Sequence, residues 1–151
     1  MTAGRICVRD VVIAEKEMPV IAVARLMRNH HVGTVVVAEH YNGLKKPVGI
    51  VTDRDLVLEV MALEIEADKL TVGDIMSREL VSVYESDSLW DVAKKMRLHG
   101  VRRVPVINGQ GGLVGILSID DFAELIAGEL ADLLQAVNRE QARERASRQQ
   151  L

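Results

Sequence analysis

Apolar side chains recur with a helical spacing in two parts of the chain, one beginning at residue 20 and the other at residue 89. In both parts they occupy positions i, i+3, i+4 and i+7, which form one stripe along an amphipathic helix. The positions are Val20, Val23, Ala24, Met27, Leu89, Val92, Ala93 and Met96. The pattern predicts two equivalent helices whose starts lie 69 residues apart.

Two short runs rich in β-branched residues follow each predicted helix, and we expect them to be strands. The four runs are 34–37, 48–51, 103–106 and 114–117. Asn42-Gly43 stands between the first two runs, and Asn108-Gly109 with Gly111-Gly112 stands between the last two. Asn-Gly is a strong signal for a tight hairpin turn, so each part is predicted to contain a β-hairpin.

A seven-residue motif joins each second strand to a further apolar helical pattern. Residues 49–55 read Gly-Ile-Val-Thr-Asp-Arg-Asp and residues 115–121 read Gly-Ile-Leu-Ser-Ile-Asp-Asp. Both follow the pattern Gly-apolar-apolar-Thr/Ser-x-x-Asp. Upstream, residues 8–12 align with residues 72–76 as entry segments. The recurrence predicts a duplicated unit made of an entry segment, a helix, two strands and a second helix.

The duplication divides the chain into four segments. We expect a first unit at 1–63, a connection at 64–71, a second unit at 72–127 and a helical extension at 128–151. A unit of this size buries only ~60% of its unfolded surface and is marginally stable alone. The two units are therefore expected to pack together.

The composition is that of a globular protein, with 48% hydrophobic and 27% charged residues. A formal net charge of −3 gives no basic field that would attract nucleic acid or an anionic membrane. No apolar run approaches the ~18 residues that span a bilayer, and the N-terminus lacks a signal-peptide pattern. Cys7 is the single cysteine, so no internal disulfide can form. We expect a cytoplasmic protein that binds neither nucleic acid nor membrane.

Sequence motifs for catalysis and metal binding are missing. The chain has no Gly-x-Gly-x-x-Gly, no phosphate-binding loop and no Cys-x-x-Cys. Its histidines show no metal-ligand spacing. His30 and His99 instead occupy equivalent positions near the C-terminal ends of predicted helices, where the helix dipole favours a partly cationic side chain. We expect no enzyme, no catalytic residue and no metal site.

The Thr/Ser-x-x-Asp part of the motif has two interpretations. At a helix start, Thr52 or Ser118 can cap a first-turn amide while Asp55 or Asp121 complements the positive helix end. Such a cap stabilises a helix by roughly 1 kcal/mol without any ligand. The same turn offers amides to an anion and a carboxylate to the two hydroxyls of a ribose. One turn can do both, and the residues alone leave both interpretations open.

Together these motifs resemble a tandem pair of cystathionine β-synthase (CBS) domains, sometimes called a Bateman module. The resemblance rests on residues 72–76, residues 99–106, the methionine-bearing helices and both motifs, and it covers residues 6 to about 127. It implies an α/β (α+β) fold of two β-α-β-β-α units packed pseudo-symmetrically through their sheets, followed by a C-terminal helical extension. It also implies two related clefts that bind adenosine-containing ligands.

The resemblance assigns residues to these clefts. It implies that Asp55 and Asp121 hold ribose hydroxyls, with Thr52 and Ser118 beside the ribose or phosphate. Backbone groups of four further residues would line the adenine pockets, namely Val12, Ile13, Met76 and Ser77.

Phosphate contacts are implied for Arg102 and Arg103, whose guanidinium groups suit phosphate geometry. Thr34 is the ligand-binding position that corresponds to Arg103 in the first copy. The two clefts are therefore expected to be unequal. By resemblance to the family, the cleft of Asp55 also draws on Ser77 and Arg103, and we expect it to be the stronger nucleotide site.

The implied function is that of a non-enzymatic regulatory module. AMP, ADP or ATP is the expected ligand, NAD or S-adenosylmethionine is the alternative, and no cofactor is required. Because the paired units occupy most of the chain, the signal would pass in trans to a partner protein. A ligand-free interaction or dimerisation module is the competing interpretation.

The resemblance further implies a homodimer, because CBS pairs commonly form disc-like dimers. Apolar positions between residues 122 and 137 continue the last helix, and mostly Arg, Glu, Gln and Ser follow from residue 139. Glu144 and Arg148 have the spacing of a helical ion pair. The segment is predicted to be a solvated helix, or to pack on a second subunit through its apolar stripe.

Overall fold

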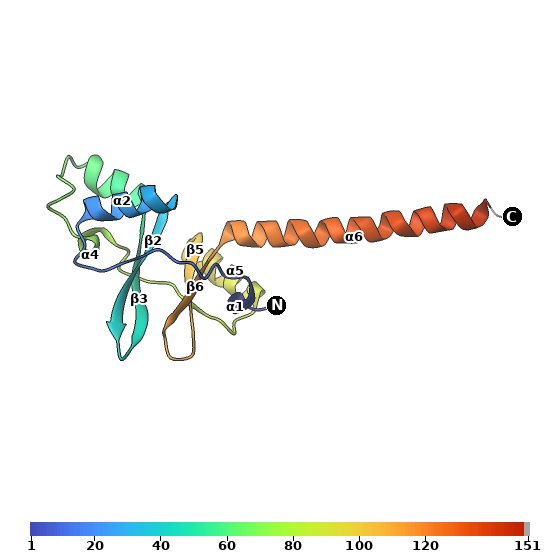
Figure 1. Cartoon of the computed structure of the whole chain (residues 1–151), viewed down its shortest axis with the longest axis horizontal. Coiled ribbons are helices and arrows are strands. Elements are labelled where there is room, and N and C mark those ends of the chain that lie inside the picture. Colours follow the sequence, from blue (N-terminus) through green and yellow to red (C-terminus); the bar gives the residue numbers. More distant parts are fainter. Residues whose placement is uncertain (150–151) are drawn as a thin grey trace. The chain divides into compact units, whose positions relative to one another are not determined.

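The computed structural model describes residues 1–149, which fold into a mixed α/β structure. A compact unit spans 1–117, and a second unit begins at Ser118 with the long C-terminal helix. Within the described residues there are two three-stranded sheets, one in each copy of the repeat (Figure 1). The mixed α/β class with a C-terminal helix is confirmed.

The first sheet has the strand order β1-β2-β3. Strand β1 (Ile13–Ala14) runs parallel to β2 (Thr34–Tyr41), and β2 forms an antiparallel hairpin with β3 (Leu44–Thr52). Asn42 and Gly43 turn the hairpin with φ angles of 49° and 78°, as their Asn-Gly pair predicts.

The second sheet repeats this arrangement with the order β4-β5-β6. Strand β4 (Val83–Tyr84) runs parallel to β5 (Arg103–Ile107), and β6 (Leu113–Ser118) lies beside β5. The short first strand pairs at the same place in both sheets. The predicted duplication of the hairpins is therefore confirmed.

Each copy places its amphipathic helix where the apolar stripe predicts it. Helix α2 (Val20–His30) and helix α5 (Leu89–His99) are both eleven residues long, and each ends at a left-handed residue. That residue is His31 in the first copy, with φ 54°, and Gly100 in the second, with φ 64°. The side chains buried by the two helices are Val20, Val23, Met27, Leu89, Val92 and Met96.

The first entry segment packs against the second copy. It forms a short helix, α1 (Ala3–Ile6). The Gly4 amide donates to the Glu85 carbonyl at 2.9 Å. Val8 and Ile116 then exchange two backbone hydrogen bonds, each of 2.9 Å. The start of the chain thus completes the sheet region of the second copy.

The second entry segment packs against the first copy in the same way. It forms helix α4 (Val72–Ile75), from which the Gly73 amide donates to the Lys16 carbonyl at 2.8 Å. The Ser77 amide donates to the Ile50 carbonyl at 3.0 Å. The copies have therefore exchanged their entry segments, and Val72 belongs to the buried core of the first copy.

This exchange corrects the predicted alignment of residues 8–12 with residues 72–76. The hydrogen bonds make Val8 the counterpart of Ser77, so the entry segments are 69 residues apart, like the helices and first strands. The prediction was wrong because residues 8–11 match the Val-x-Asp-apolar pattern of residues 72–75. Their place in the fold is set by long-range backbone hydrogen bonds, which a comparison of residue types does not detect.

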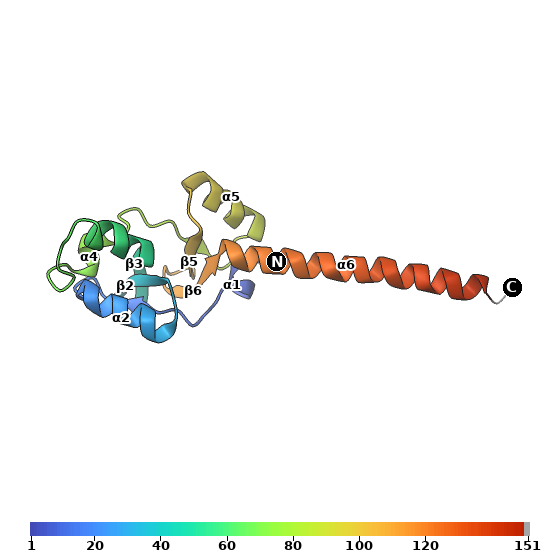
Figure 2. The ribbon, with the colours of Figure 1, turned by 90° about the horizontal axis from the view of Figure 1, so that it is seen from above.

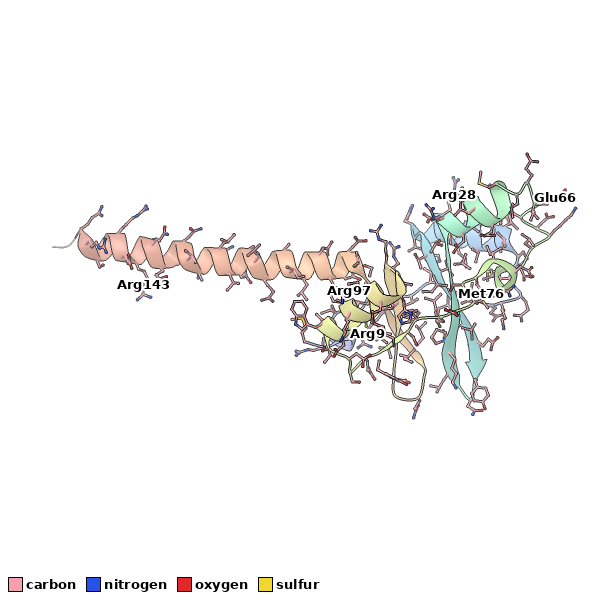
Figure 3. The ribbon with its side chains drawn as sticks, turned by 180° about the vertical axis from the view of Figure 1, so that it is seen from behind. Arg9, Arg28, Glu66, Met76, Arg97 and Arg143 are labelled. Atoms are coloured by element: carbon pink, nitrogen blue, oxygen red, sulfur yellow. The ribbon has the colours of Figure 1, made fainter. Side chains whose placement is uncertain are left out.

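Two glycines permit the exchanged segments to approach the second strands closely. A Cβ atom on Gly49 would lie 2.7 Å from the Sδ atom of Met76, a residue that is labelled in Figure 3, and one on Gly115 would lie 2.7 Å from both Cys7 Sγ and the Val8 carbonyl oxygen. Both distances are shorter than van der Waals contact. The glycine that opens each motif therefore has a packing role.

The helices after the two motifs differ. In the first copy, α3 (Asp53–Leu56) continues as the π-helix η1 (Val57–Met61). In the second, α6 (Ile119–Arg148) is one unbroken helix of 30 residues (Figure 2). The predicted helical extension is thus part of α6.

Candidate functional site

A cleft of about 500 Å³ lies within the compact unit, between the motif of the first copy and residues of the second. Its volume is in the range of small-molecule sites. The lining residues are Ile50, Thr52, Asp53, Arg54, Asp55, Ser77, Glu79, Leu80, Val81, Gly100, Val101, Arg102 and Arg103. Five of the predicted site residues meet here: Thr52, Asp55, Ser77, Arg102 and Arg103.

Thr52 and Asp55 form a reciprocal capping box at the start of α3. The Asp55 amide donates to Thr52 Oγ1 at 3.3 Å, and the Thr52 amide donates to Asp55 Oδ2 at 2.8 Å. No hydrogen bond within the described residues involves Asp55 Oδ1. The structural interpretation of the motif is therefore correct, and Asp55 Oδ1 can still accept a hydrogen bond.

Ser77 connects the second entry segment to β3 through hydrogen bonds. Its Oγ accepts from the Ile50 amide at 3.1 Å, and its amide donates to the Ile50 carbonyl at 3.0 Å. The counterpart residue, Val8, has no hydroxyl and accepts the Ile116 amide through its backbone instead. The contact between β3 and the second entry segment thus includes a hydrogen bond to the side chain of Ser77, whereas Val8 contacts β6 through its backbone.

Charged side chains of both signs surround the cleft. Arg102 directly precedes β5 and Arg103 is the first residue of β5, and both are exposed, as is Arg54 on α3. Asp53 and Glu79 add carboxylates at the same place. Arg54, Asp53 and Glu79 were not predicted, although Asp53 and Arg54 occupy the two variable positions of the motif. A phosphate near the guanidinium groups would be held by charge-assisted hydrogen bonds.

Other predicted residues lie outside this cleft. Met76 packs against the first core and against Gly49, rather than among the lining residues. Ile13 is the first residue of β1, and Val12 directly precedes it and accepts from the Val36 amide through its carbonyl. In the corrected alignment, the counterpart of Val12 is Val81, which does line the cleft.

The second motif repeats the capping box of the first, and Thr34 lies at the start of β2. Thr34 pairs with Thr52 in the sheet, and its Oγ1 is buried without a hydrogen-bond partner in the described structure. At the start of α6, the Ser118 amide donates to Asp121 Oδ2 at 2.6 Å and the Asp121 amide donates to Ser118 Oγ at 3.3 Å. Ligand binding by these residues stays a prediction.

The described residues contain no cluster of three or more His, Cys, Asp and Glu side chains suited to a metal ion. His30 and His99 are the last residues of α2 and α5. Among the described helices, none combines the length and apolar character required to cross a bilayer.

Comparison with known proteins identifies a shared family. The family model described as CBS domain matches residues 3–62 and 72–128. The CBS domain-containing protein YhcV of Bacillus subtilis is 39% identical over 100 residues, covering 66% of this chain and 67% of that protein. An uncharacterized protein of Methanopyrus kandleri is 31% identical over 125 residues, covering 83% of this chain but only 62% of that protein.

A solved structure agrees with these matches. It is that of a CBS domain protein from Pyrobaculum aerophilum complexed with AMP. The two chains are 30% identical and superpose with a TM-score of 0.74, over 87% of this chain and 99% of the other.

Proposed function

The chain belongs to the CBS domain family as a tandem pair, and from that premise we propose that it is a non-catalytic regulatory module that binds an adenosine nucleotide. The observation that carries the proposal is the meeting of Asp55, Thr52, Ser77, Arg102 and Arg103 around one cleft. The AMP complex of the Pyrobaculum aerophilum relative supports the same ligand class.

Each group has a role that its position supports. Asp55 accepts ribose hydroxyls through Oδ1, because Oδ2 is occupied by the Thr52 amide. Arg102 and Arg103 bind phosphate. Val81 and Ile50 contribute apolar surface for the base. AMP, ADP and ATP share these features and are the first candidates, with NAD and S-adenosylmethionine as alternatives.

The regulatory role is inferred from the fact that the cleft residues belong to both copies of the repeat. Asp55 belongs to the first copy, whereas Ser77 and Arg103 belong to the second. A nucleotide that contacts both copies binds one arrangement of them better than another and shifts the population toward it. We propose that a cytoplasmic partner protein reads this change in trans and that the module itself is a homodimer.

Binding is tested by thermal unfolding of the purified chain with AMP, ADP, ATP, NAD and S-adenosylmethionine. A ligand at about 100 times its Kd adds roughly 2.7 kcal/mol, which raises Tm by about 5–10 °C in a domain of this size. A Tm that does not move with any of the five would contradict nucleotide binding and favour the ligand-free interaction module.

Asp55→Asn tests the site itself. Asparagine retains an acceptor for the Thr52 amide but loses the carboxylate, so nucleotide affinity is expected to fall roughly 10- to 100-fold in calorimetric titration. Asp68→Asn, an equal charge change at an exposed residue outside the cleft, is the matched control. Equal affinity for Asp55→Asn and the parent protein would refute the ribose role.

A further inference from the structure

Helix α6 carries an exposed apolar cluster halfway along its length. The four side chains are Leu130, Leu133, Leu134 and Val137, with exposed fractions of 55%, 66%, 58% and 50%. Their spacing places them on one stripe of the helix. Large side chains gathered on one exposed face, rather than scattered singly, mark an interaction surface.

Leu130, Leu133, Leu134 and Val137 are symmetric about the middle of the helix, and Ile126, which is 53% exposed, extends the stripe by one turn toward the start of α6. Leu130 and Val137 are equally distant from the point between Leu133 and Leu134, and so are the two ends of α6 (Ile119–Arg148). An antiparallel copy of the same helix therefore places Leu130 opposite Val137 and Leu133 opposite Leu134, with full overlap. A two-fold interface requires this kind of self-complementary pattern.

Charge determines the direction of such a pair. The half of α6 before the midpoint carries five acidic residues and no Lys or Arg: Asp120, Asp121, Glu124, Glu129 and Asp132. The half after the midpoint carries four arginines and two glutamates: Arg139, Glu140, Arg143, Glu144, Arg145 and Arg148. Arg143 marks this second half in Figure 3. The halves thus have net charges of −5 and +2.

A parallel pair would set −5 against −5 and +2 against +2, whereas an antiparallel pair sets opposite charges together at both ends. Opposed helix dipoles also favour the antiparallel direction. We propose that α6 binds α6 of a second copy of this chain as an antiparallel pair centred between Leu133 and Leu134. The pairing is separate from the nucleotide cleft and from any contact made by the sheets or the other helices.

Disulfide cross-linking tests the direction and register. In a Cys7→Ser background, Ile126 lies opposite Gln141 of the second copy, and the two Ile126 residues are about 22 Å apart along the axis. The double variant Ile126→Cys/Gln141→Cys is expected to form a covalent dimer under mild oxidation, and Ile126→Cys alone is not. Cross-linking by Ile126→Cys alone would establish a parallel pair, and no cross-link in the double variant would refute the pairing.

A stripe variant in the double-cysteine background tests the role of the cluster. Leu134→Asp places a carboxylate against the apolar cluster of the second copy and is expected to reduce covalent dimer at least about tenfold. Gln135→Asp adds the same charge on the opposite face of the helix and is expected to leave the yield unchanged. Circular dichroism checks that both variants keep α6. Undiminished cross-linking in Leu134→Asp would overturn the proposal, whereas nucleotide binding is unaffected by either result.

Discussion

At the scale of single residues, Asp55 combines an observed structural role with the binding role that we propose for it. Its Oδ2 accepts the Thr52 amide at 2.8 Å and completes the cap, while Oδ1 has no partner among the described residues. The cap holds the carboxylate in position before a ligand arrives, which lowers the entropic cost of binding. The two interpretations that the sequence leaves open are therefore compatible with each other.

Gly115 provides a stability prediction. A methyl group there would lie 2.7 Å from the Val8 carbonyl oxygen, a backbone atom that cannot turn aside. Gly115→Ala is expected to lower the free energy of unfolding by about 1–3 kcal/mol, as overpacking does. Gly109→Ala serves as the control, because a methyl group at Gly109 would meet no atom within 4 Å. The free energies of unfolding of both variants are measured by urea titration. An unchanged value for Gly115→Ala would show that the entry segment can move away from the added methyl group.

The hydrogen bonds of Asp74 predict that the stability of the protein depends on pH. Hydrogen bonds from the Thr71 amide and hydroxyl hold the pKa of Asp74 below its ordinary value of 3.8. Because the folded pKa is lower than the unfolded one, the stabilisation is full above the ordinary value and disappears as the pH falls through the lowered pKa.

Asp74→Asn is therefore expected to destabilise the protein at pH 7 and to have a shrinking effect below pH ~4. The free energies of unfolding of variant and parent, measured by urea titration at several pH values, check the trend. A difference that grows on acidification would contradict it.

The exchanged entry segments are the main feature at the scale of elements. Each short helix is held by backbone hydrogen bonds to the other copy, so neither copy is complete in a continuous stretch of chain. Ala3 illustrates the consequence, because it is fully buried although it is the third residue of the chain. The first entry segment is therefore part of the packed interior.

Ala3→Asp is accordingly expected to cost at least ~2 kcal/mol of stability, since it places a charge in a buried site. Arg5→Glu, on the exposed side of α1, is expected to stay within about ±0.5 kcal/mol. Thermal and urea unfolding check both variants. If Ala3→Asp and Arg5→Glu were equally stable, α1 would detach from the second copy at little cost in free energy.

The sequence predicts the regular elements well and the exchange poorly. Helices α2 and α5 could be predicted because their apolar stripes are local periodic patterns. The turn at Asn42-Gly43 could be predicted because the residues of the turn themselves favour it. The partner of Val8 is Ile116, more than a hundred residues away, and no local pattern specifies it. Glu79 was missed for the same reason, because only the fold brings it to the cleft.

At the scale of the whole molecule, the charge pattern of α6 predicts that self-association through this helix weakens with salt. Raising the salt concentration from about 0.05 M to about 0.5 M shortens the Debye length several-fold and screens the attraction between the acidic and basic halves. The Kd of association, measured by sedimentation equilibrium, is expected to rise, and more so for the parent than for Arg143→Gln/Arg145→Gln. Association that strengthens with salt in both proteins would show that the charges have no such role.

The exchange of entry segments also has a meaning for a single copy of the repeat. One copy on its own would carry an entry segment with nothing to bind and a sheet edge with nothing to cover it. Two separate copies could satisfy both needs by swapping these segments, as domain-swapped dimers do. The duplicated chain places both partners on one polypeptide, so an encounter between two molecules has become an intramolecular contact that no longer depends on protein concentration.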